Sequence, residues 1–553
     1  MRRTLALSVV LAAFGVSFAA QAQESAGEVP VNSSLSVLSE GASEPSETPL
    51  PAVEVRGEPV RDRAFEWQQQ GSPVQAAPPG SGAAADDRKI LLSNPALVEV
   101  DVESVEGGSA AEGGDSVGQK VLDYIGDRFW FASYGRVQPS INPVDGSPGR
   151  QTRLIAPSPR IDEGSYVELT LGYVPYRDER GVEVEVVTTL ALDGAKLFHF
   201  DGNWDANLAV RNLYVEARNL WIDGLRLWAG SRMYRGDDIY LLDFWPLDNL
   251  NTYGGGVGWH GKTRTNIDLH FGVNRLTNSY QFQVVEVVDE RFVGEREVVF
   301  LDRQRFIASL KVEQLFGREE GVQFKAKLYG EVHAIGEGEY LQTQPEEVKK
   351  LPSDIGWLVG GQFGVSNFLG ESFANVFVKY AGGLAAYGEM AIPFGISTDL
   401  RAAKARQFLF GVSSGLDFHY VNMLLGGYVR YFRNANGIDE DFDDGVEGVW
   451  NVRITGRVGR YFAPGIELSQ QLRRPNGLSP VTQTQDLGSI FKLSLLPAVR
   501  FGEGMLSRPE IRLNYTVSFL NEAARNMFPE RDRLRKAEVV HFLGIAAEWW
   551  FNL

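Results

Sequence analysis

The segment Arg226–Asn249 concentrates side chains that are suited to bind a polyhydroxylated molecule. It reads RLWAGSRMYRGDDIYLLDFWPLDN and sets guanidinium and carboxylate groups among aromatic rings. Carboxylates accept hydrogen bonds from sugar hydroxyls and guanidinium groups donate them, while flat rings pack on the apolar faces of pyranose units. The segment therefore predicts a sugar-selective constriction. A loop folded over polar residues for stability alone fits the same residues equally well, so both interpretations stay open at this point.

Two further motifs resemble enzyme sites but lack the surroundings that enzyme chemistry needs. Residues Gly411–Gly415 (GVSSG) match a nucleophile elbow, which requires a strand that enters a helix, whereas here the alternation of residue types continues through the motif. We interpret them as small residues within a strand. The glycine run Gly254–Gly258 lacks the following helix of a dinucleotide-binding loop. We therefore predict no catalytic residues, no cofactor and no enzyme activity.

The stretch Asn436–Glu447 (NGIDEDFDDGVE) is a second concentration of carboxylates. Alternate carboxylates are typical calcium ligands, but the glycine falls one place too late for an EF-hand loop. We interpret the stretch as a solvated acidic extracellular loop and predict no metal site, with calcium binding as the alternative.

Composition and charge narrow the class of protein. The 553 residues include 54 Lys and Arg against 71 Asp and Glu, and the resulting net charge of −17 argues against binding to nucleic acid. No cysteine is present, which excludes disulfides, thiolate metal sites and cysteine nucleophiles. No long apolar run follows the N-terminal region, so membrane-spanning helices are excluded. A membrane β-barrel stays possible, because its alternating strands average out in hydropathy.

The N-terminal residues indicate export. A positively charged start, the apolar stretch Leu5–Phe18 and an A-x-A cleavage motif make residues 1–22 a predicted signal peptide. Residues 23–120 are acidic and rich in Pro, Ser and Gly. Because such a segment buries too little apolar surface to offset its chain entropy, we expect it to be disordered. Residues 121–553 are expected to form the folded domain.

From residue 121 onward, apolar and polar residues alternate. In Tyr166–Val174 (YVELTLGYV) the apolar residues fall on one face of a strand and Tyr, Glu, Thr and Gly fall on the other, and EIRLNYTVSF behaves alike. The strands are long enough to cross a bilayer when tilted, and their polar faces carry Lys, Arg and Glu, as a water-filled lumen does. We therefore predict an all-β fold, a transmembrane antiparallel β-barrel of about 18 strands, in preference to a soluble sandwich or propeller.

Several motifs, in the same chain order, resemble the maltoporin family of carbohydrate-specific porins. WAGSRMYRGDDIYLLDFW resembles the segment that precedes and forms that family's constriction loop, and FASYGR, GSYVELTLG, LSRPEIRL and AAEWWF are similar to strands at its start and end. The resemblance runs from about Phe131 to Phe551. It implies an outer-membrane barrel, a homotrimer, and passive uptake of oligosaccharides along aromatic rings beside a polar track. The chain departs from the family at Gly236, where the family has an arginine.

The resemblance also implies which residues bind sugar. The ring ladder would include Tyr166, Trp204, Phe462 and Trp550, with Tyr134 projecting into the lumen; the polar track would include Arg136, Arg211, Asp238 and Asp243, with Trp245 in the constriction. Strand parity supports part of this assignment, because Tyr166 lies on the polar face of its strand and Trp550 shares a face with Glu548. Phe462 is out of phase with the inward Arg453 unless a bulge intervenes.

The first hypothesis for the function is a sugar-selective porin of the bacterial outer membrane, through which maltodextrin-like oligosaccharides diffuse passively. Its partners would be oligosaccharides, outer-membrane lipid and further copies of the chain in a homotrimer, and no nucleic acid. The first alternative is a general diffusion porin without sugar preference. The second is a barrel that serves as an anchor or adhesin, with residues 23–120 as its working part.

Overall fold

The computed structural model describes residues 128–193, 207–278, 280–288, 295–318, 321–343, 346–389, 400–433, 444–502 and 504–552. The predicted signal peptide at 1–22 and the predicted disordered segment at 23–120 lie outside these residues, as do Trp204 and most of the acidic stretch 436–447. Within the described ranges, no helix is both long enough and apolar enough to cross a bilayer.

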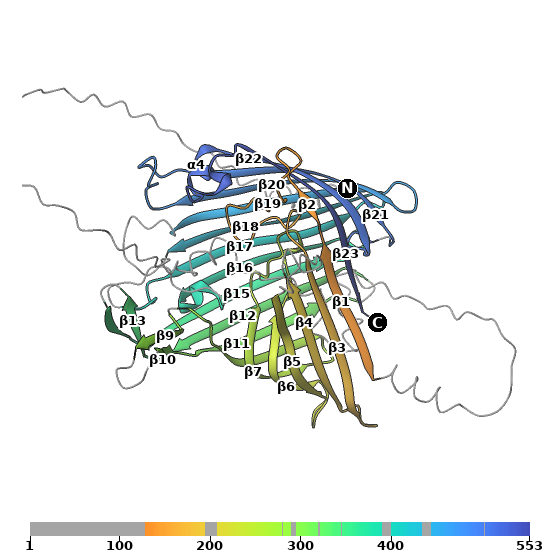
Figure 1. Cartoon of the computed structure of the whole chain (residues 1–553). Coiled ribbons are helices and arrows are strands. Elements are labelled where there is room, and N and C mark those ends of the chain that lie inside the picture. The colour runs from red at the N-terminus through yellow and green to blue at the C-terminus, as the bar shows by residue number, and fades with distance from the viewer. Residues whose placement is uncertain are drawn as a thin grey trace, which may run out of the picture. The chain divides into compact units, whose positions relative to one another are not determined.

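The described residues form a closed antiparallel barrel of 18 strands, which confirms the predicted fold. The strands are β1 Phe129–Val137, β3 Tyr166–Arg177, β4 Glu183–Asp193, β5 Asn207–Arg218, β6 Leu225–Arg235, β7 Asn249–His260, β8 Thr265–Asn274, β11 Arg305–Phe316, β12 Gln323–Ile335, β15 Asp354–Ser366, β16 Phe373–Gly383, β17 Arg406–Asp417, β18 Val421–Arg433, β19 Gly445–Gly456, β20 Phe462–Pro475, β21 Gly488–Arg500, β22 Glu510–Leu520 and β23 Val539–Asn552. Each strand pairs with the next along the chain, and β1 pairs with β23 to close the sheet (Figure 1). In that pairing Tyr134 lies opposite Trp550.

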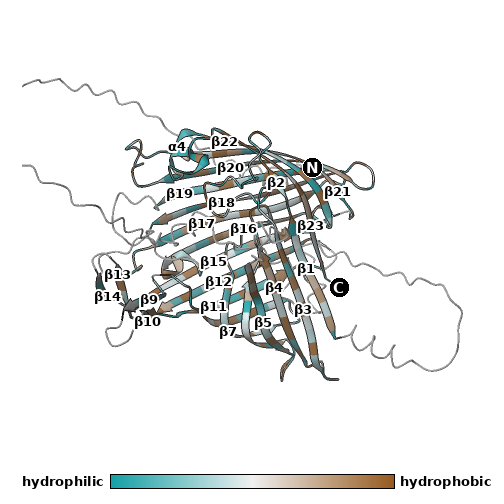
Figure 2. Ribbon diagram, viewed as in Figure 1, coloured by the Kyte–Doolittle hydropathy of each residue, from teal (hydrophilic) through white to brown (hydrophobic). Residues whose placement is uncertain are grey.

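The alternation predicted from the sequence decides which side of each strand faces the lumen. On β3, Leu171 is 50% exposed on the outside of the barrel, whereas its neighbour Thr170 is 1% exposed on the inside. On β22, Ile511 is 51% exposed and Arg512 is 4% exposed. Hydrophobic and hydrophilic residues alternate along single strands in Figure 2. An apolar exterior around a polar, buried interior is the arrangement that a barrel in lipid requires.

The two ends of the barrel differ in the length of their connections. At one end the strands are joined by short turns, such as Phe418–Tyr420 between β17 and β18. Short turns are typical of the periplasmic end of outer-membrane barrels, and longer loops of the extracellular end. The long connections at the other end carry further elements: β2 Ser140–Ile141, η3 Tyr240–Leu242, β9 Phe282–Val288, β10 Glu295–Asp302, β13 Gly338–Thr343, β14 Glu346–Leu351, η4 Leu384–Tyr387, α4 Glu522–Asn526 and η5 Arg533–Arg535.

Two of the long connections fold into the lumen. Residues 236–248, which we name the constriction loop, join β6 to β7, and residues 150–165, which we name the inner segment, belong to the connection between β1 and β3. The constriction loop buries Ile239 and Leu241 completely. A Cβ at Gly411 would lie 3.2 Å from Ile239 Cδ1, and one at Gly426 would lie 2.7 Å from Ile239 Cγ2. The GVSSG motif is thus part of strand β17, and its first glycine leaves room for the constriction loop.

Replacing Gly426 with alanine is expected to destabilise the folded barrel by about 1–3 kcal/mol, because the new methyl group overlaps Ile239 and one of the two must move. Urea-induced unfolding in lipid vesicles, followed by tryptophan fluorescence, measures the change. Gly361→Ala is the matched control, because its Cβ would meet its nearest atom at 3.4 Å. Equal unfolding midpoints for the two variants would contradict the contact between Ile239 and β18.

Candidate functional site

Five aromatic side chains converge inside the barrel, and we name them the ring cluster: Tyr134, Tyr166, Tyr240, Trp245 and Trp550. Three of the rings, Tyr134, Tyr166 and Trp550, belong to strands of the barrel wall. The ring centroid of Tyr134 lies 6.5 Å from that of Trp550 and 6.1 Å from that of Tyr166, so Tyr134 is the middle ring of the three. Tyr240 of the constriction loop meets Trp550 edge to face at 6.1 Å. Four of these rings were predicted as site residues from the resemblance, and Tyr240 was not.

Strand parity and barrel closure bring the wall residues of this cluster together. Tyr134 lies on β1 between its two neighbouring strands, opposite Trp550 of β23 and opposite Glu168 of β3. Tyr166 lies two positions from Glu168 on the same face, and its hydroxyl donates a hydrogen bond to that carboxylate. The three rings therefore line up across β23, β1 and β3, although their residues come from both ends of the chain.

A network of arginine and glutamate side chains surrounds the rings on one side. Arg508 donates hydrogen bonds to Glu548 at 2.8 Å and to the hydroxyl of Tyr240 at 2.5 Å. Glu510 accepts from Arg500 and Arg512, each at 2.6 Å. These groups are almost fully buried. Each charge has a partner of opposite sign, which offsets the cost of removing it from water.

Guanidinium groups cover the faces of four of the five rings. Arg508 lies 4.4 Å from the ring centroid of Trp550, and Arg235 lies 4.2 Å from that of Trp245. Arg160, from the inner segment, lies 5.0 Å from the ring of Tyr240 and 5.8 Å from that of Tyr134. These distances fit cation–π contacts. A ligand that stacks on these rings must therefore exchange places with a guanidinium.

The polar residues predicted from the resemblance lie around this cluster. Arg136 donates to Glu163 at 2.8 Å and to the carbonyl of Gly164 at 3.0 Å. Arg211 lies 3.9 Å from Glu168. Asp243 lies 3.8 Å from Arg160. Asp243 also ends the 3-10 helix η3 in the left-handed region (φ 54°), a conformation that aspartate adopts more readily than most residues.

Lysines of β11 and β12 hold both ends of the constriction loop. Lys325 and Lys327 donate to the carboxylate of Asp237 at 2.9 Å and 3.0 Å. Lys327 and Lys311 each lie 3.7 Å from Asp248 at the other end of the loop. The paired lysines lower the pKa of Asp237 despite its burial. Asp237 and Asp248 therefore fix the two ends of the loop. The other two carboxylates of the loop, Asp238 and Asp243, are not held by these lysines.

Gly236 stands beside this anchor. A Cβ at this position would overlap the carboxylate of Asp248, so the seated loop has no room for a larger side chain there unless Asp248 moves. The backbone N–H of Gly236 donates a hydrogen bond to the carbonyl of Asp248 at 3.1 Å, so the two ends of the loop lie close together. Glycine, where the resemblance implies an arginine, leaves room for this close approach.

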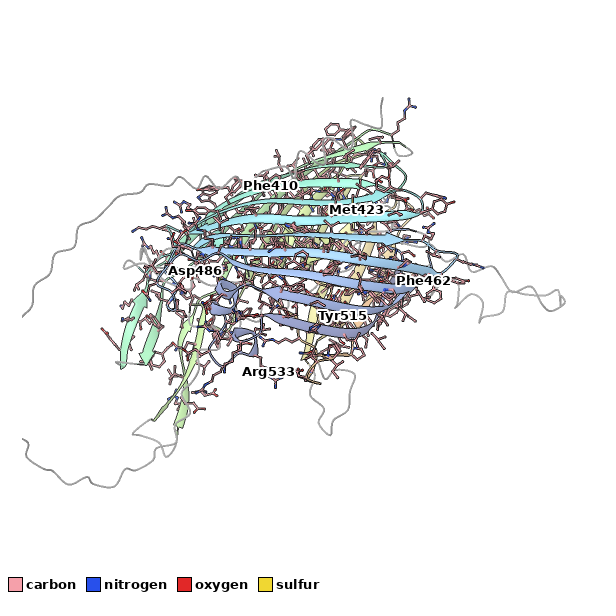
Figure 3. The ribbon with its side chains drawn as sticks, turned by 90° about the horizontal axis from the view of Figure 1, so that it is seen from above. Phe410, Met423, Phe462, Asp486, Tyr515 and Arg533 are labelled. Carbon is pink, nitrogen blue, oxygen red and sulfur yellow. The ribbon has the colours of Figure 1, made fainter. Side chains whose placement is uncertain are left out.

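The structure does not bring every predicted residue to the cluster. Phe462 is 45% exposed on the same outward face of β20 as Ile466, whereas Ala463 and Glu467 face inward and are buried. Figure 3 shows Phe462 at the end of its strand. The pairing of β20 with β21 runs without a bulge from Phe462 onward, which accounts for the outward position of this ring. Trp204 lies outside the described residues.

Sequence reasoning missed Arg160, Arg508 and Glu510 as members of the site, and it placed Tyr240 in the constriction segment without assigning it to the ring ladder. The inward parity of β22 and β23 was a usable signal for Glu510 and Glu548. No local pattern marks Arg160, because its position depends on where the inner segment folds. Within the part of the chain that the structure describes, no group of three or more acidic or histidine side chains is arranged to hold a metal ion.

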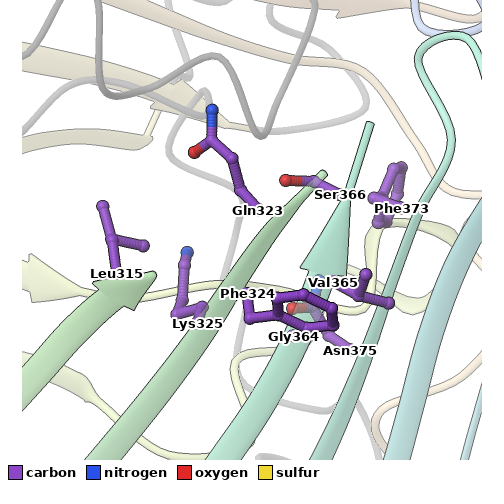
Figure 4. A pocket seen from close by; sticks show the side chains of 9 residues that line it. All are labelled: Leu315, Gln323, Phe324, Lys325, Gly364, Val365, Ser366, Phe373 and Asn375. Carbon is purple, nitrogen blue, oxygen red and sulfur yellow. The ribbon is translucent and has the colours of Figure 1, made fainter. Parts of the chain in front are cut away.

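A small hollow lies at the short-turn end of the barrel, beside Lys325, which also binds Asp237 of the constriction loop. It is lined by Leu315, Gln323, Phe324, Lys325, Gly364, Val365, Ser366, Phe373 and Asn375. Figure 4 shows the side chains of Gln323 and Lys325 on the same side of β12. Lys325 thus lines this hollow and also holds the constriction loop through Asp237.

A closed barrel with an apolar exterior, a charged lumen and an inward constriction loop is the architecture of a porin of the bacterial outer membrane. The model of the LamB porin family matches residues 129–551, so the chain belongs to this family of sugar-specific porins. No sequence among the curated proteins matches the chain.

Solved structures of other bacterial proteins also align with the chain. OpdK of Pseudomonas aeruginosa with vanillate has 12% sequence identity and a TM-score of 0.36, covering 77% of this chain and 98% of its own. OccK2 (OpdF) of the same organism has 11% identity and a TM-score of 0.42, with 77% and 98% covered. OccAB1 of Acinetobacter baumannii has 9% identity and a TM-score of 0.40, with 77% and 96% covered. At these values the alignments carry no conclusion about this chain.

Raising the pH through 7 is expected to increase the cation selectivity of the pore. Burial, with the neighbouring carboxylates of Asp243 and Asp237, raises the pKa of Asp238 to about 7, against the opposing effect of Arg160. The Asp238 carboxyl is therefore neutral below this pH and carries a negative charge in the constriction above it. The reversal potential across a planar bilayer under a KCl gradient, measured at pH 5 and pH 9, reports the change.

Asp238→Asn should remove most of this response. Glu389→Gln is the control, because burial also raises the pKa of Glu389 to about 7, but this residue lies against Asn251 at the start of β7. An undiminished pH response in Asp238→Asn would show that another group is responsible.

Proposed function

We propose that the protein takes up oligosaccharides of the maltodextrin type by passive, facilitated diffusion, with the ring cluster and the charged constriction as the selective part of the path. The observation that supports this most strongly is the convergence of five aromatic rings with arginine and carboxylate groups at the constriction loop. Rings bind the apolar faces of a pyranose, and the charged groups exchange hydrogen bonds with its hydroxyls.

The strength of each contact suits transport rather than retention. A contact between two aromatic rings contributes about 0.5–1.5 kcal/mol beyond its buried area, and we expect a similar gain for a pyranose on a ring, so that no one ring holds the sugar tightly. Arg508 and Arg160 already lie on the ring faces, and a sugar that enters exchanges cation–π contacts for stacking contacts of similar size. A small net gain at each step allows the sugar both to bind and to leave.

The lumen contacts also orient the hydroxyl groups of a passing sugar. Glu548 accepts from Arg508 and lies 3.2 Å from Arg160, so each of its oxygens already has a donor. A sugar hydroxyl can replace either guanidinium as donor to Glu548 and can accept from the guanidinium that it displaces. The polar track thus conserves the number of hydrogen bonds as the sugar advances, which keeps the barrier to movement low.

We propose in addition that the channel works as a homotrimer, as the family resemblance implies. The test is single-channel recording in a planar bilayer with maltodextrin added. A trimer of sugar-binding pores should close reversibly in three equal steps. A current that no oligosaccharide alters would favour the general diffusion porin, and the absence of any current would favour the anchor or adhesin.

Trp550→Ala is expected to weaken maltodextrin block roughly two- to tenfold, because the variant loses one ring contact of about 0.5–1.5 kcal/mol. Titration of the ion current with maltodextrin gives the dissociation constant. Phe462→Ala is the matched control: it removes an aromatic ring of the same barrel, but from the outward face. If both variants bound sugar as the unaltered protein does, the ring cluster would not be the binding site.

A further inference from the structure

The inner segment, residues 150–165, lies inside the barrel without being part of its wall. No residue of it belongs to a strand, and Ile155 and Ile161 are 3% and 1% exposed. The residues that connect β1 to the inner segment are more exposed than the segment itself: Val144, at the end of the barrel with the long connections, is 72% exposed. The connection thus passes from solvent into the lumen and returns to the wall at Tyr166.

Polar groups hold the inner segment against the strands β20 to β22. Asp162 accepts hydrogen bonds from Lys492 of β21 at 2.7 Å and 2.8 Å, and both side chains are 1% exposed. Asn514 of β22 donates to the carbonyl of Ile161 at 2.7 Å. The side chain of Gln471 on β20 accepts from the backbone N–H of Leu154 at 2.8 Å.

The same segment contacts the constriction loop and the ring cluster. The backbone N–H of Arg160 donates to the carbonyl of Leu241 at 3.2 Å. Its guanidinium covers Tyr240 and Tyr134, donates to the hydroxyl of Tyr134, and lies 3.2 Å from Glu548. Arg160 therefore occupies ring faces and a carboxylate that the proposed function assigns to the sugar.

The exposure of the rings bears on how a sugar could reach them. Tyr134 and Tyr166 are each 2% exposed and Trp550 is 6% exposed. A ring that stacks on a pyranose must present a face to it, and these rings present almost none: Arg160 of the inner segment covers Tyr134, and Arg508 covers Trp550. The path through the ring cluster is therefore closed in this arrangement.

We infer that the inner segment is a displaceable plug, which closes the pore when Asp162 is paired with Lys492 and opens it when it leaves the wall. This inference rests on the proposed function for the role of the rings, but the closure itself concerns the flow of ions. Hydrogen bonds and ion pairs hold the segment at a few points, and water and sugar hydroxyls can replace them, while Leu154 and Ile155 add buried apolar contacts that displacement must also break. Because both ends of the connection are tied to β1 and β3, the segment can leave the lumen without unfolding the barrel.

The test is the ion conductance of the full-length protein in a planar bilayer, without sugar. Lys492→Met leaves the Asp162 carboxylate buried without its lysine, which favours a displaced segment, and the conductance should rise roughly twofold or more. In the double variant Asp162→Asn/Lys492→Met neither group is charged. The asparagine side chain keeps an oxygen for the backbone N–H of Thr152, which donates to Asp162 at 3.1 Å in the unaltered protein. The conductance of the double variant should therefore return toward that of the unaltered protein.

The double variant separates displacement from the loss of a lumen charge, because both variants lack the lysine. Lys262→Met, which removes a surface ion pair with Asp223 at the short-turn end, is the control that should change nothing. Equal conductance in the unaltered protein and in Lys492→Met would overturn the inference. So would a rise of equal size in the single and double variants.

Trypsin gives an independent reading of the same displacement in protein reconstituted in vesicles. Arg150 is exposed and should be cut in every variant, whereas Arg160 is buried and should be cut only when the segment leaves the lumen. Faster cleavage after Arg160 in Lys492→Met than in the double variant would support the plug, and protection in both would contradict it. If the conductance rises as expected but maltodextrin does not block the opened variant, the proposed function fails while the plug stands.

Discussion

Closure of the sheet is the constraint on which the rest of this structure depends. In the hydrocarbon of a membrane, every backbone N–H and carbonyl group must find a partner within the protein, so a sheet that crosses it can have no free edge. The pairing of β1 with β23 satisfies this requirement. The same pairing sets Tyr134 opposite Trp550 and Arg136 opposite Glu548, so the pairing that completes the barrel also assembles the centre of the site from the two ends of the folded domain.

The polar interior is a second consequence of the same architecture. Because the apolar residues face lipid, the charged residues of each strand face inward, and each needs a partner where water is scarce. The inward loops supply many of these partners: Asp237 and Asp248 to the lysines of β11 and β12, and Asp162 to Lys492. The ion pairs that stabilise the lumen thus also hold in place the constriction loop, which carries Tyr240 and Trp245, and the inner segment.

The period-two pattern of single strands was enough to predict the barrel and the inward faces of Tyr166 and Trp550, and the length of the folded region gave the approximate strand number. The same reasoning showed Phe462 to be out of phase, and the structure places it on the outer face. The remaining members of the site depend on contacts across great separations in sequence, such as that of Arg160 with Glu548. Parity cannot position a loop residue, since a loop has no repeating geometry, and so the role of Arg160 and the contact of Tyr240 with Trp550 become apparent only from the fold.

The proposed function requires that sugar binds on the ring cluster and takes the place of the guanidinium groups there. An experimental structure of the protein with a bound maltodextrin tests this most directly. In that structure we expect pyranose units stacked on Trp550 and Tyr134, with Arg160 and Arg508 moved from the ring faces. A sugar bound elsewhere in the lumen, with both arginines still on their rings, would contradict it.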